Sequence, residues 1–197
     1  MKVNKKILST SALFAASALL SVGAQAEGTY VTDQGHTEIV FVWDHAGVTF
    51  QHGEFTKAEG TLELGEKMED SKISVVVDAA SLDSGFEPLD KHLKSADFFE
   101  VEKYPEITFT STSVVEKEEN MLEVTGDMTI HGVTQPVVLE AVLTHKGEHP
   151  LGKNFDYYKG DWIAFSATAE IDHMSFGVGA FSTGPITIEI NTEMKAN

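Results

Sequence analysis

Apolar and polar residues alternate along most of this chain with a period of two. The segment "MLEVTGDMTI" places Leu122, Val124, Met128 and Ile130 on one side and polar residues on the other. "PITIEINTEM" and "DWIAFSATAEI" repeat the pattern. Such alternation is typical of antiparallel strands that have one buried face and one solvated face. The sequence therefore predicts an all-β fold.

The alternation predicts about eight or nine strands, separated by turns such as "EKEEN" and "HGVTQP". We expect strands over 29–33, 36–45, 54–64, 71–78, 106–117, 121–130, 135–146, 161–172 and 185–195. The segment "EPLDKHLKSADFF" departs from this period, because its leucines are spaced helically after a proline suited to a helix start. Strands with one apolar face can close into a barrel or stack as a sandwich, and the period does not decide between the two. A short helix between strands would cover one end of either.

Residues 1–26 have the pattern of a secretory signal peptide. Lys2, Lys5 and Lys6 form a positive start, an apolar run of small residues follows, and "AQA" ends the segment with small residues at the cleavage positions. We expect cleavage after Ala26, export to the periplasm, and a single domain over 27–197.

The chain is strongly acidic. Its net charge is −17, and it becomes −20 without the three lysines of the first 26 residues. Such a field repels phosphate backbones and anionic bilayers, so neither nucleic-acid binding nor electrostatic membrane docking is expected. The chain has no cysteine, so an exported domain must be stabilised by core burial. It also has no arginine, so no guanidinium group is present to form two parallel hydrogen bonds with an anionic head group.

The sequence shows little support for catalysis or metal binding. His145 and His149 are four residues apart, but they lie in a Gly/Pro turn without a third ligand at zinc-like spacing. There is no cysteine nucleophile and no Gly-x-Ser-x-Gly elbow. "FGVGAFSTG" lacks the strand-to-helix setting of a phosphate-binding loop. We therefore predict no catalytic residue, no metal and no cofactor, and we expect a protein that is not an enzyme.

Large aromatic residues are frequent at positions expected to face inward. They are Phe41, Trp43, Phe50, Phe55, Phe98, Phe99, Phe109, Phe165 and Phe176. Such rings either fill a core or line a cavity for an apolar ligand, and composition alone favours the filled core. His45 shares the parity of Phe41 and Trp43, so its polar tip needs a partner in the core or on a ligand.

Several segments resemble the YceI-like family of exported, polyisoprenoid-binding proteins. These are "GHTEIVFVWDHAG", "LDKHLKSADFFEVEKYPEITFTSTSV", "VTGDMTIHGVTQPVVLEAVL" and "FSATAEIDHMSFGV", and they occur in the family's order. The resemblance implies a lipocalin-like antiparallel β-barrel of about eight strands, with a short helix over one end and a long apolar tunnel inside. It also implies binding rather than turnover. The ligands of such proteins are long isoprenoid chains, including quinone-like ones, and in some members fatty acids or amides.

The resemblance places a ligand-binding site inside the barrel. The expected apolar contacts are Ile39, Phe41, Trp43, Phe98, Phe99, Phe109, Met128, Ile130, Phe165 and Phe176. The expected polar contacts near the mouth are His45, Asp90, His92 and His173. The family usually has an arginine where this chain has Leu89, and without any arginine a neutral quinone or an uncharged polyprenol is favoured over a diphosphate.

The expected function is therefore a periplasmic carrier of a polyprenol or prenyl quinone, in transport, storage or stress response. Its expected partners are an isoprenoid or another long-chain amphiphile and, transiently, a membrane protein, and it would be a monomer or a homodimer. Two alternatives stay open at this point. One is a barrel with a filled core that acts in stress response, and the other is an enzyme on a lipid-like substrate.

Overall fold

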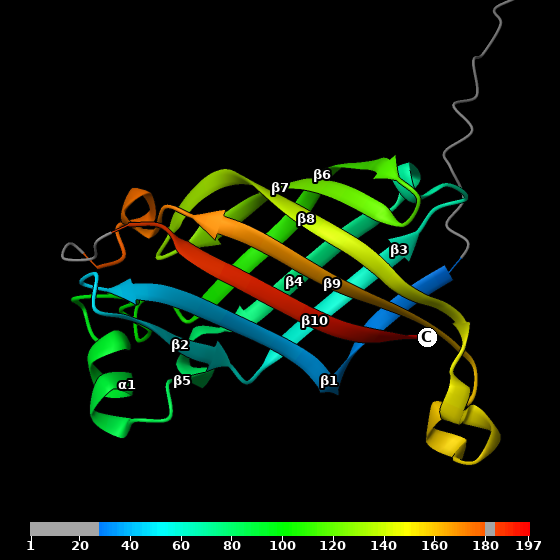
Figure 1. Ribbon diagram of the computed structural model, residues 1–197, viewed down its shortest axis with the longest axis horizontal. Helices are drawn as coiled ribbons and strands as arrows, with labels where there is room; N and C mark the ends of the chain where they lie inside the picture. The colour runs from blue at the N-terminus through cyan, green and yellow to red at the C-terminus, as the bar shows by residue number, and fades with distance from the viewer. Residues whose placement is uncertain (1–27, 180–183) are drawn as a thin grey trace, which may run out of the picture.

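Ten strands of the computed structural model, which describes residues 28–179 and 184–197, form one antiparallel sheet (Figure 1). They are β1 (Gly28–His45), β2 (Thr49–Phe55), β3 (Ala58–Leu64), β4 (Lys72–Asp78), β5 (Leu82–Asp83), β6 (Glu106–Glu118), β7 (Met121–Ile130), β8 (Val133–Glu148), β9 (Asp161–Ile171) and β10 (Ile186–Ala196). The helical elements are α1 (Glu87–Leu93) and the 3-10 turns η1 (Met68–Asp70), η2 (Ala79–Ser81), η3 (Pro150–Lys153), η4 (Asp156–Tyr158) and η5 (His173–Phe176). The predicted signal peptide lies outside the described residues.

The sheet closes into a barrel because its first and last strands pair. The order is β10-β9-β8-β7-β6-β4-β3-β1, and β1 pairs with β10 from Tyr30↔Ala196 to Val42↔Thr187. This ring of eight strands satisfies the backbone groups that an open sheet would leave at its edges. The expected barrel of about eight strands, with a short helix, is confirmed.

The strand β1 is longer than the sequence indicated. Segments 29–33 and 36–45, expected as two strands, form one strand with an irregularity between Thr32 and Thr37. The first part of β1 pairs with β3, and the last part pairs with β2. The irregularity thus lies where the neighbour of β1 changes from β3 to β2. Bulges are common at such positions on the rims of barrels.

The strand β2 was not predicted as a separate element. Segment 54–64, expected as one strand, contains only the end of β2, a break at Thr56 and Lys57, and then β3. The inward positions of β2 include Gln51 and Gly53, so most of this strand lacks the apolar face by which strands are recognised. The other long strands, β4 and β6 to β10, begin and end within two residues of their expected bounds.

The turn "HGVTQP" joins β7 to β8 as a hairpin, as expected. Ile130 pairs with Val133, which leaves His131 and Gly132 as a two-residue loop. Both have positive φ, 52° and 75°, the backbone of a turn whose twist matches that of the flanking strands. The hairpin prediction is confirmed.

The helix α1 is shorter than the segment 87–99 that the leucine spacing indicated. It ends at Leu93, and the amide of Phe99 donates to the carbonyl oxygen of Leu93 at 3.0 Å, which folds the chain back. Phe99 is therefore turned into the barrel and is buried. In Figure 1, α1 lies at one end of the barrel, beside β2 and β5.

The interior divides into a main apolar core and a smaller one at the end away from α1. The smaller core contains Tyr30, Leu62, Leu64, Ile163 and Met194. All five are buried, so they fill the barrel at the end away from α1. Among the described residues, no helix is both long enough and apolar enough to cross a membrane.

Candidate functional site

A cavity of about 160 Å³ lies among the inward side chains of the barrel. It exists because small residues, Ala58, Gly60, Ala141 and Ala167, alternate with large ones around the wall. The polar side chains of the wall are hydroxyls of serine and threonine, and no charged side chain stands among its described residues. Hydrocarbon walls of this kind suit an apolar chain and offer little to an ion.

A second space of about 580 Å³, here called the end chamber, lies under α1. Its apolar wall comes from Trp43, Leu89, Leu93, Phe98 and Val178. Its polar groups are Asp44, His45, Gln51, His92 and His173. Because His45, Gln51 and His92 are exposed, the end chamber reaches the molecular surface.

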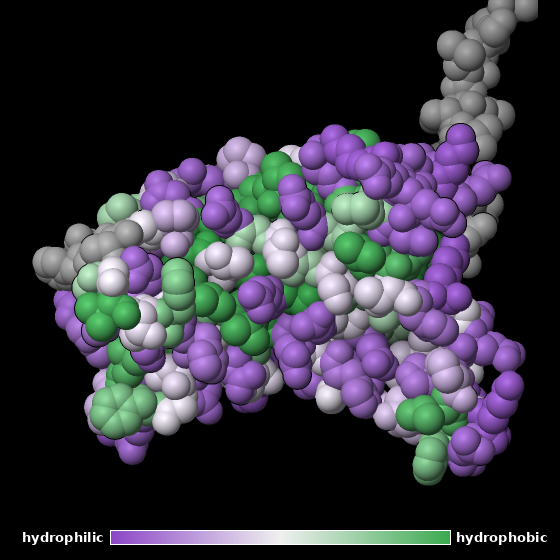
Figure 2. Space-filling model, in the orientation of Figure 1, coloured by the Kyte–Doolittle hydropathy of each residue, from purple (hydrophilic) through white to green (hydrophobic). Residues whose placement is uncertain are grey.

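Large apolar side chains are exposed on the elements around the end chamber. Val48 and Phe50 in the β1–β2 hairpin are 80% and 75% exposed, Phe86 before α1 is 62% exposed, and Met174 in η5 is 48% exposed. The inward direction expected for Phe50 is therefore wrong, because the sequence did not reveal β2 and its register. Figure 2 shows hydrophobic residues among hydrophilic ones at this end of the molecule, on the left in the view. Four large apolar side chains are thus exposed around the end chamber.

The barrel cavity and the end chamber adjoin each other. Phe41, Phe99, Ile130 and Ile186 line both spaces. The Phe99 ring stands edge-on to Phe55 with 5.7 Å between ring centroids, and 6.5 Å from the Phe41 ring. An extended molecule that occupied both spaces would pass these rings.

The double aromatic of "SADFFE" is explained by this arrangement. Phe99 lines both spaces, whereas the half-buried Phe98 lines the end chamber alone. Phe98 stands edge-on to His92 at 5.0 Å. A Cβ at Gly179 would lie only 2.7 Å from the Phe98 ring, so glycine allows this close contact. The pair therefore forms the boundary between the two spaces and part of the chamber wall.

A family model described as a YceI-like domain matches residues 30–196. The chain belongs to the YceI-like family. A UPF0312 protein of Vibrio parahaemolyticus is 38% identical over 192 residues, covering 96% of this chain and 97% of the relative. A UPF0312 protein of Vibrio campbellii is 43% identical over 150 residues, covering 75% and 79% respectively.

Solved structures share the fold of this YceI-like barrel. BcnA of Burkholderia cenocepacia matches with a TM-score of 0.72 and 19% identity, over 82% of this chain and 98% of BcnA. A polyisoprenoid binding domain from Saccharophagus degradans matches with a TM-score of 0.63 and 11% identity, over 86% and 99%. At these identities the likeness concerns the fold.

The YceI-like barrel brings together most of the residues expected at the ligand site. The barrel cavity is lined by Ile39, Phe41, Phe99, Phe109, Met128, Ile130 and Phe165. The end chamber is lined by Trp43, His45, His92, Phe98 and His173, together with Phe41, Phe99 and Ile130. Parity along each strand identified the strand residues of the first group, because alternate side chains of a closed barrel all face one interior. Phe99 lies outside the strands and was expected there from the family resemblance.

Asp90 and Phe176 line neither space. The Asp90 carboxylate accepts bonds from the amide and hydroxyl of Ser84, at 2.7 and 2.5 Å, which fixes the loop before α1. The Ser84 hydroxyl is the main reason that the pKa of Asp90 lies below its ordinary value. Phe176 is 2% exposed and packs in the main core. Both residues lie outside the strands, where parity gives no direction for a side chain.

Several lining residues were absent from the expected set although their strands carried the signal. Phe55, Leu139, Ile186, Ile188 and Ile190 share the inward parity of residues that were included. Leu89 and Leu93 of α1 line the end chamber, and their helical spacing was visible in the sequence. The resemblance predicted that the helix covers one end of the barrel, but it did not predict which of its side chains line the end chamber.

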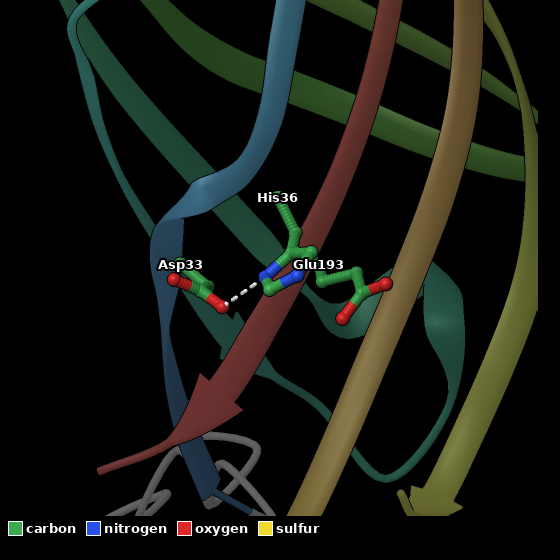
Figure 3. A group of neighbouring side chains, drawn as sticks. All are labelled: Asp33, His36 and Glu193. Atoms are coloured by element: carbon green, nitrogen blue, oxygen red, sulfur yellow. Dashed lines mark hydrogen bonds and ion pairs between the residues drawn. The ribbon is translucent and has the colours of Figure 1, made fainter. Parts of the chain in front are cut away.

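A polar cluster lies outside the barrel at the far end, where β1 and β10 meet the loop that carries η3 and η4. Figure 3 shows its members Asp33, His36 and Glu193. Nδ1 of His36 lies 2.7 Å from Oδ2 of Asp33, and the Tyr157 hydroxyl donates to Oδ1 of Asp33 at 2.7 Å. Nε2 of His36 lies 3.2 Å from the Tyr158 hydroxyl. These bonds tie the loop to the irregular part of β1.

The cluster has the residue types of a metal site, and its three ligand atoms lie within 4.8 Å of one another. Hydrogen bonds already engage the Asp33 carboxylate and both ring nitrogens of His36. A metal would have to replace these bonds, so the geometry fits a structural network. The histidines weighed in the sequence were others, and of these His149 lies beside the cluster, with Nε2 3.4 Å from Oε2 of Glu193.

Proposed function

We propose that this YceI-like protein is an exported carrier that holds one long isoprenoid lipid. The apolar tail would lie in the barrel cavity, and the head group would lie in the end chamber. The observation that carries the proposal is the junction of two unlike spaces, one walled by hydrocarbon and one with polar groups at its rim. That polarity matches a molecule with a long apolar tail and a small polar end.

The physical chemistry of such a ligand favours an enclosed site. Each methylene-sized unit that leaves water contributes about 0.8 kcal/mol, so a long prenyl tail gains most when it is fully covered. Met68, Met128 and Met194 line the barrel cavity. Their flexible thioether side chains can repack around a chain that enters between them. The interior can therefore adapt to a tail larger than the empty cavity.

The comparisons support the ligand class and the N-terminal sequence supports the compartment. The Saccharophagus degradans neighbour is named as a polyisoprenoid binding domain, and this protein shares its fold. The signal-like pattern of residues 1–26 supports a periplasmic location. In this proposal the ligand is a polyprenol or prenyl quinone, no further cofactor takes part, and a membrane protein is the transient donor or acceptor.

The two alternatives make different predictions. A barrel filled by its own side chains would have no space for a ligand, and the adjoining cavities argue against it. An enzyme on a lipid-like substrate would convert an added isoprenoid into product, whereas a carrier returns it unchanged.

The decisive experiment is organic extraction of freshly purified protein, followed by mass spectrometry. We expect an isoprenoid at about one equivalent per chain, and an added polyprenol should be recovered chemically intact. Protein that contains no isoprenoid and binds neither polyprenols nor prenyl quinones would contradict the carrier function. Recovery of a modified lipid would instead support the enzyme.

A further inference from the structure

The tautomer of His173 is fixed by the backbone. This residue begins η5, separated from the end of β9 by one residue, and lies in the wall of the end chamber with 6% of its surface exposed. Its Nδ1 lies 2.5 Å from the carbonyl oxygen of Val178. A carbonyl oxygen can only accept a hydrogen bond, so Nδ1 must carry the hydrogen. In the neutral ring, Nε2 is then an acceptor.

This acceptor has no partner. Nε2 of His173 is shielded from water and makes no hydrogen bond within the described part of the chain. Two other buried polar atoms of the described residues also make no hydrogen bond, but each lies beside a charged partner: Nε2 of His131 is 3.4 Å from Oε2 of Glu100, and Oε2 of Glu193 is 3.4 Å from Nε2 of His149. A buried polar atom without a partner lowers stability and is uncommon in folded proteins. Nε2 is therefore a site where a hydrogen-bond donor would be stabilised.

The other polar groups of the end chamber differ from His173 because they are exposed to water or already have a partner. His45 and Gln51 are exposed, and the exposed His92 has Nε2 3.3 Å from Oδ2 of Asp97. The half-buried Asp44 accepts a hydrogen bond from the amide of Gly47 at 2.8 Å. A polar group that is exposed to water can replace a hydrogen bond to the ligand with one to water at little cost in free energy. Such groups therefore discriminate weakly between head groups. A hydrogen-bond acceptor that water cannot reach discriminates strongly, because a ligand without a donor leaves the acceptor without any hydrogen bond.

We propose that Nε2 of His173 selects lipids whose head group donates a hydrogen bond. A polyprenol hydroxyl, a quinol hydroxyl or a primary amide meets this requirement. An ether, an ester, an oxidised quinone or an ionised diphosphate offers only acceptors and would place two lone pairs face to face. The inference therefore narrows the proposed ligands to the polyprenol and the reduced, quinol form of a prenyl quinone. The inference rests on the proposed function, since the head group reaches the chamber only when the tail lies in the barrel. Because Nε2 is covered in the empty structure, side chains of the chamber wall must shift as the head group enters.

The test compares two ligands that differ at one position, a polyprenol and its methyl ether with the same chain length. Each competes with a fluorescent prenyl probe for the full mature chain. We expect the alcohol to bind roughly tenfold more tightly, the size of one buried hydrogen bond. The variant His173→Phe should bring the ratio close to one. The matched control His52→Phe changes an exposed histidine of β2 outside both spaces and should keep the ratio.

The outcomes separate this inference from the carrier function. Equal binding of alcohol and ether by the wild type, or an unchanged ratio in His173→Phe, would overturn the role of His173 and leave the carrier standing. Binding of neither ligand would overturn both. If His173→Phe does not fold, ¹⁵N spectra of the wild type decide. The hydrogen of His173 should be on Nδ1, and the Nε2 signal should move upfield with the alcohol but not with the ether. A hydrogen on Nε2 would refute the inference.

Discussion

At the residue scale, the bond between Asp33 and His36 makes stability depend on pH. This bond is the main cause that raises the pKa of His36 above its ordinary 6.5. Burial acts to raise the pKa of Asp33, but bonds from His36, Tyr157 and Gly35 hold it below 3.8. The contribution of Asp33 is lost as pH falls through its lowered pKa, and that of His36 is lost as pH rises through its raised pKa. The pair therefore stabilises most between about pH 4 and 6.5.

The variant His36→Gln should accordingly lose stability mainly within that window. Because the His36 side chain is 42% exposed and screened by water, we expect a loss of no more than about 1 kcal/mol. Urea unfolding at a series of pH values measures it, with His52→Gln as the control. A loss that is equal at pH 5 and pH 9 would show that the charge of the pair does not contribute.

At the scale of elements, the β7–β8 hairpin depends on Gly132. Its φ is 75°, and a Cβ there would lie 2.5 Å from the Tyr104 ring, which packs against His131 at 4.4 Å between ring centroids. Gly132→Ala should cost about 1–2 kcal/mol for the left-handed backbone and about 1–3 kcal/mol more for the clash. Gly85 has a similar φ of 74°, but its Cβ would meet nothing within 4 Å in the described structure.

Gly85→Ala is therefore the matched control, and it should show only the backbone part of the loss. Denaturant unfolding of both variants measures the difference. If both variants lose the same free energy of unfolding, the Tyr104 ring moves aside without a loss of stability, and the predicted effect of the clash is wrong.

At the scale of the whole molecule, ligand binding and barrel stability are linked. A ligand that binds only the folded barrel, at a free concentration of 100 times its Kd, raises the free energy of unfolding by about 2.7 kcal/mol. Ala167 of β9 lines the barrel cavity, whereas its neighbour Thr168 is exposed on the outer face. Ala167→Phe should fill the cavity, lose up to about 3 kcal/mol through overpacking, and abolish stabilisation by a polyprenol.

Thr168→Phe should keep that stabilisation, since its side chain lies outside. Thermal unfolding with and without the lipid compares the two variants. If the lipid stabilises Ala167→Phe as much as the wild type, the tail does not occupy the barrel.

The sequence by itself determined the strands and the direction of their side chains. Parity is a local property of a strand, so the alternation alone assigns Phe41, Phe109 and Phe165 to the interior. It failed where the pattern was weak, as in β2, whose inward positions include Gln51 and Gly53. The family resemblance supplied the barrel, which the period of two left open.

The tertiary structure alone decided how distant segments meet. The pairing of β1 with β10, the position of Phe99 between the two spaces and the network around Asp33 all join residues far apart in the chain. The same holds for the end chamber, where His173 comes beside α1 although about eighty positions separate them. The alternation along one strand carries no information about such contacts, because they depend on how the sheet closes and on loops that have no regular apolar pattern.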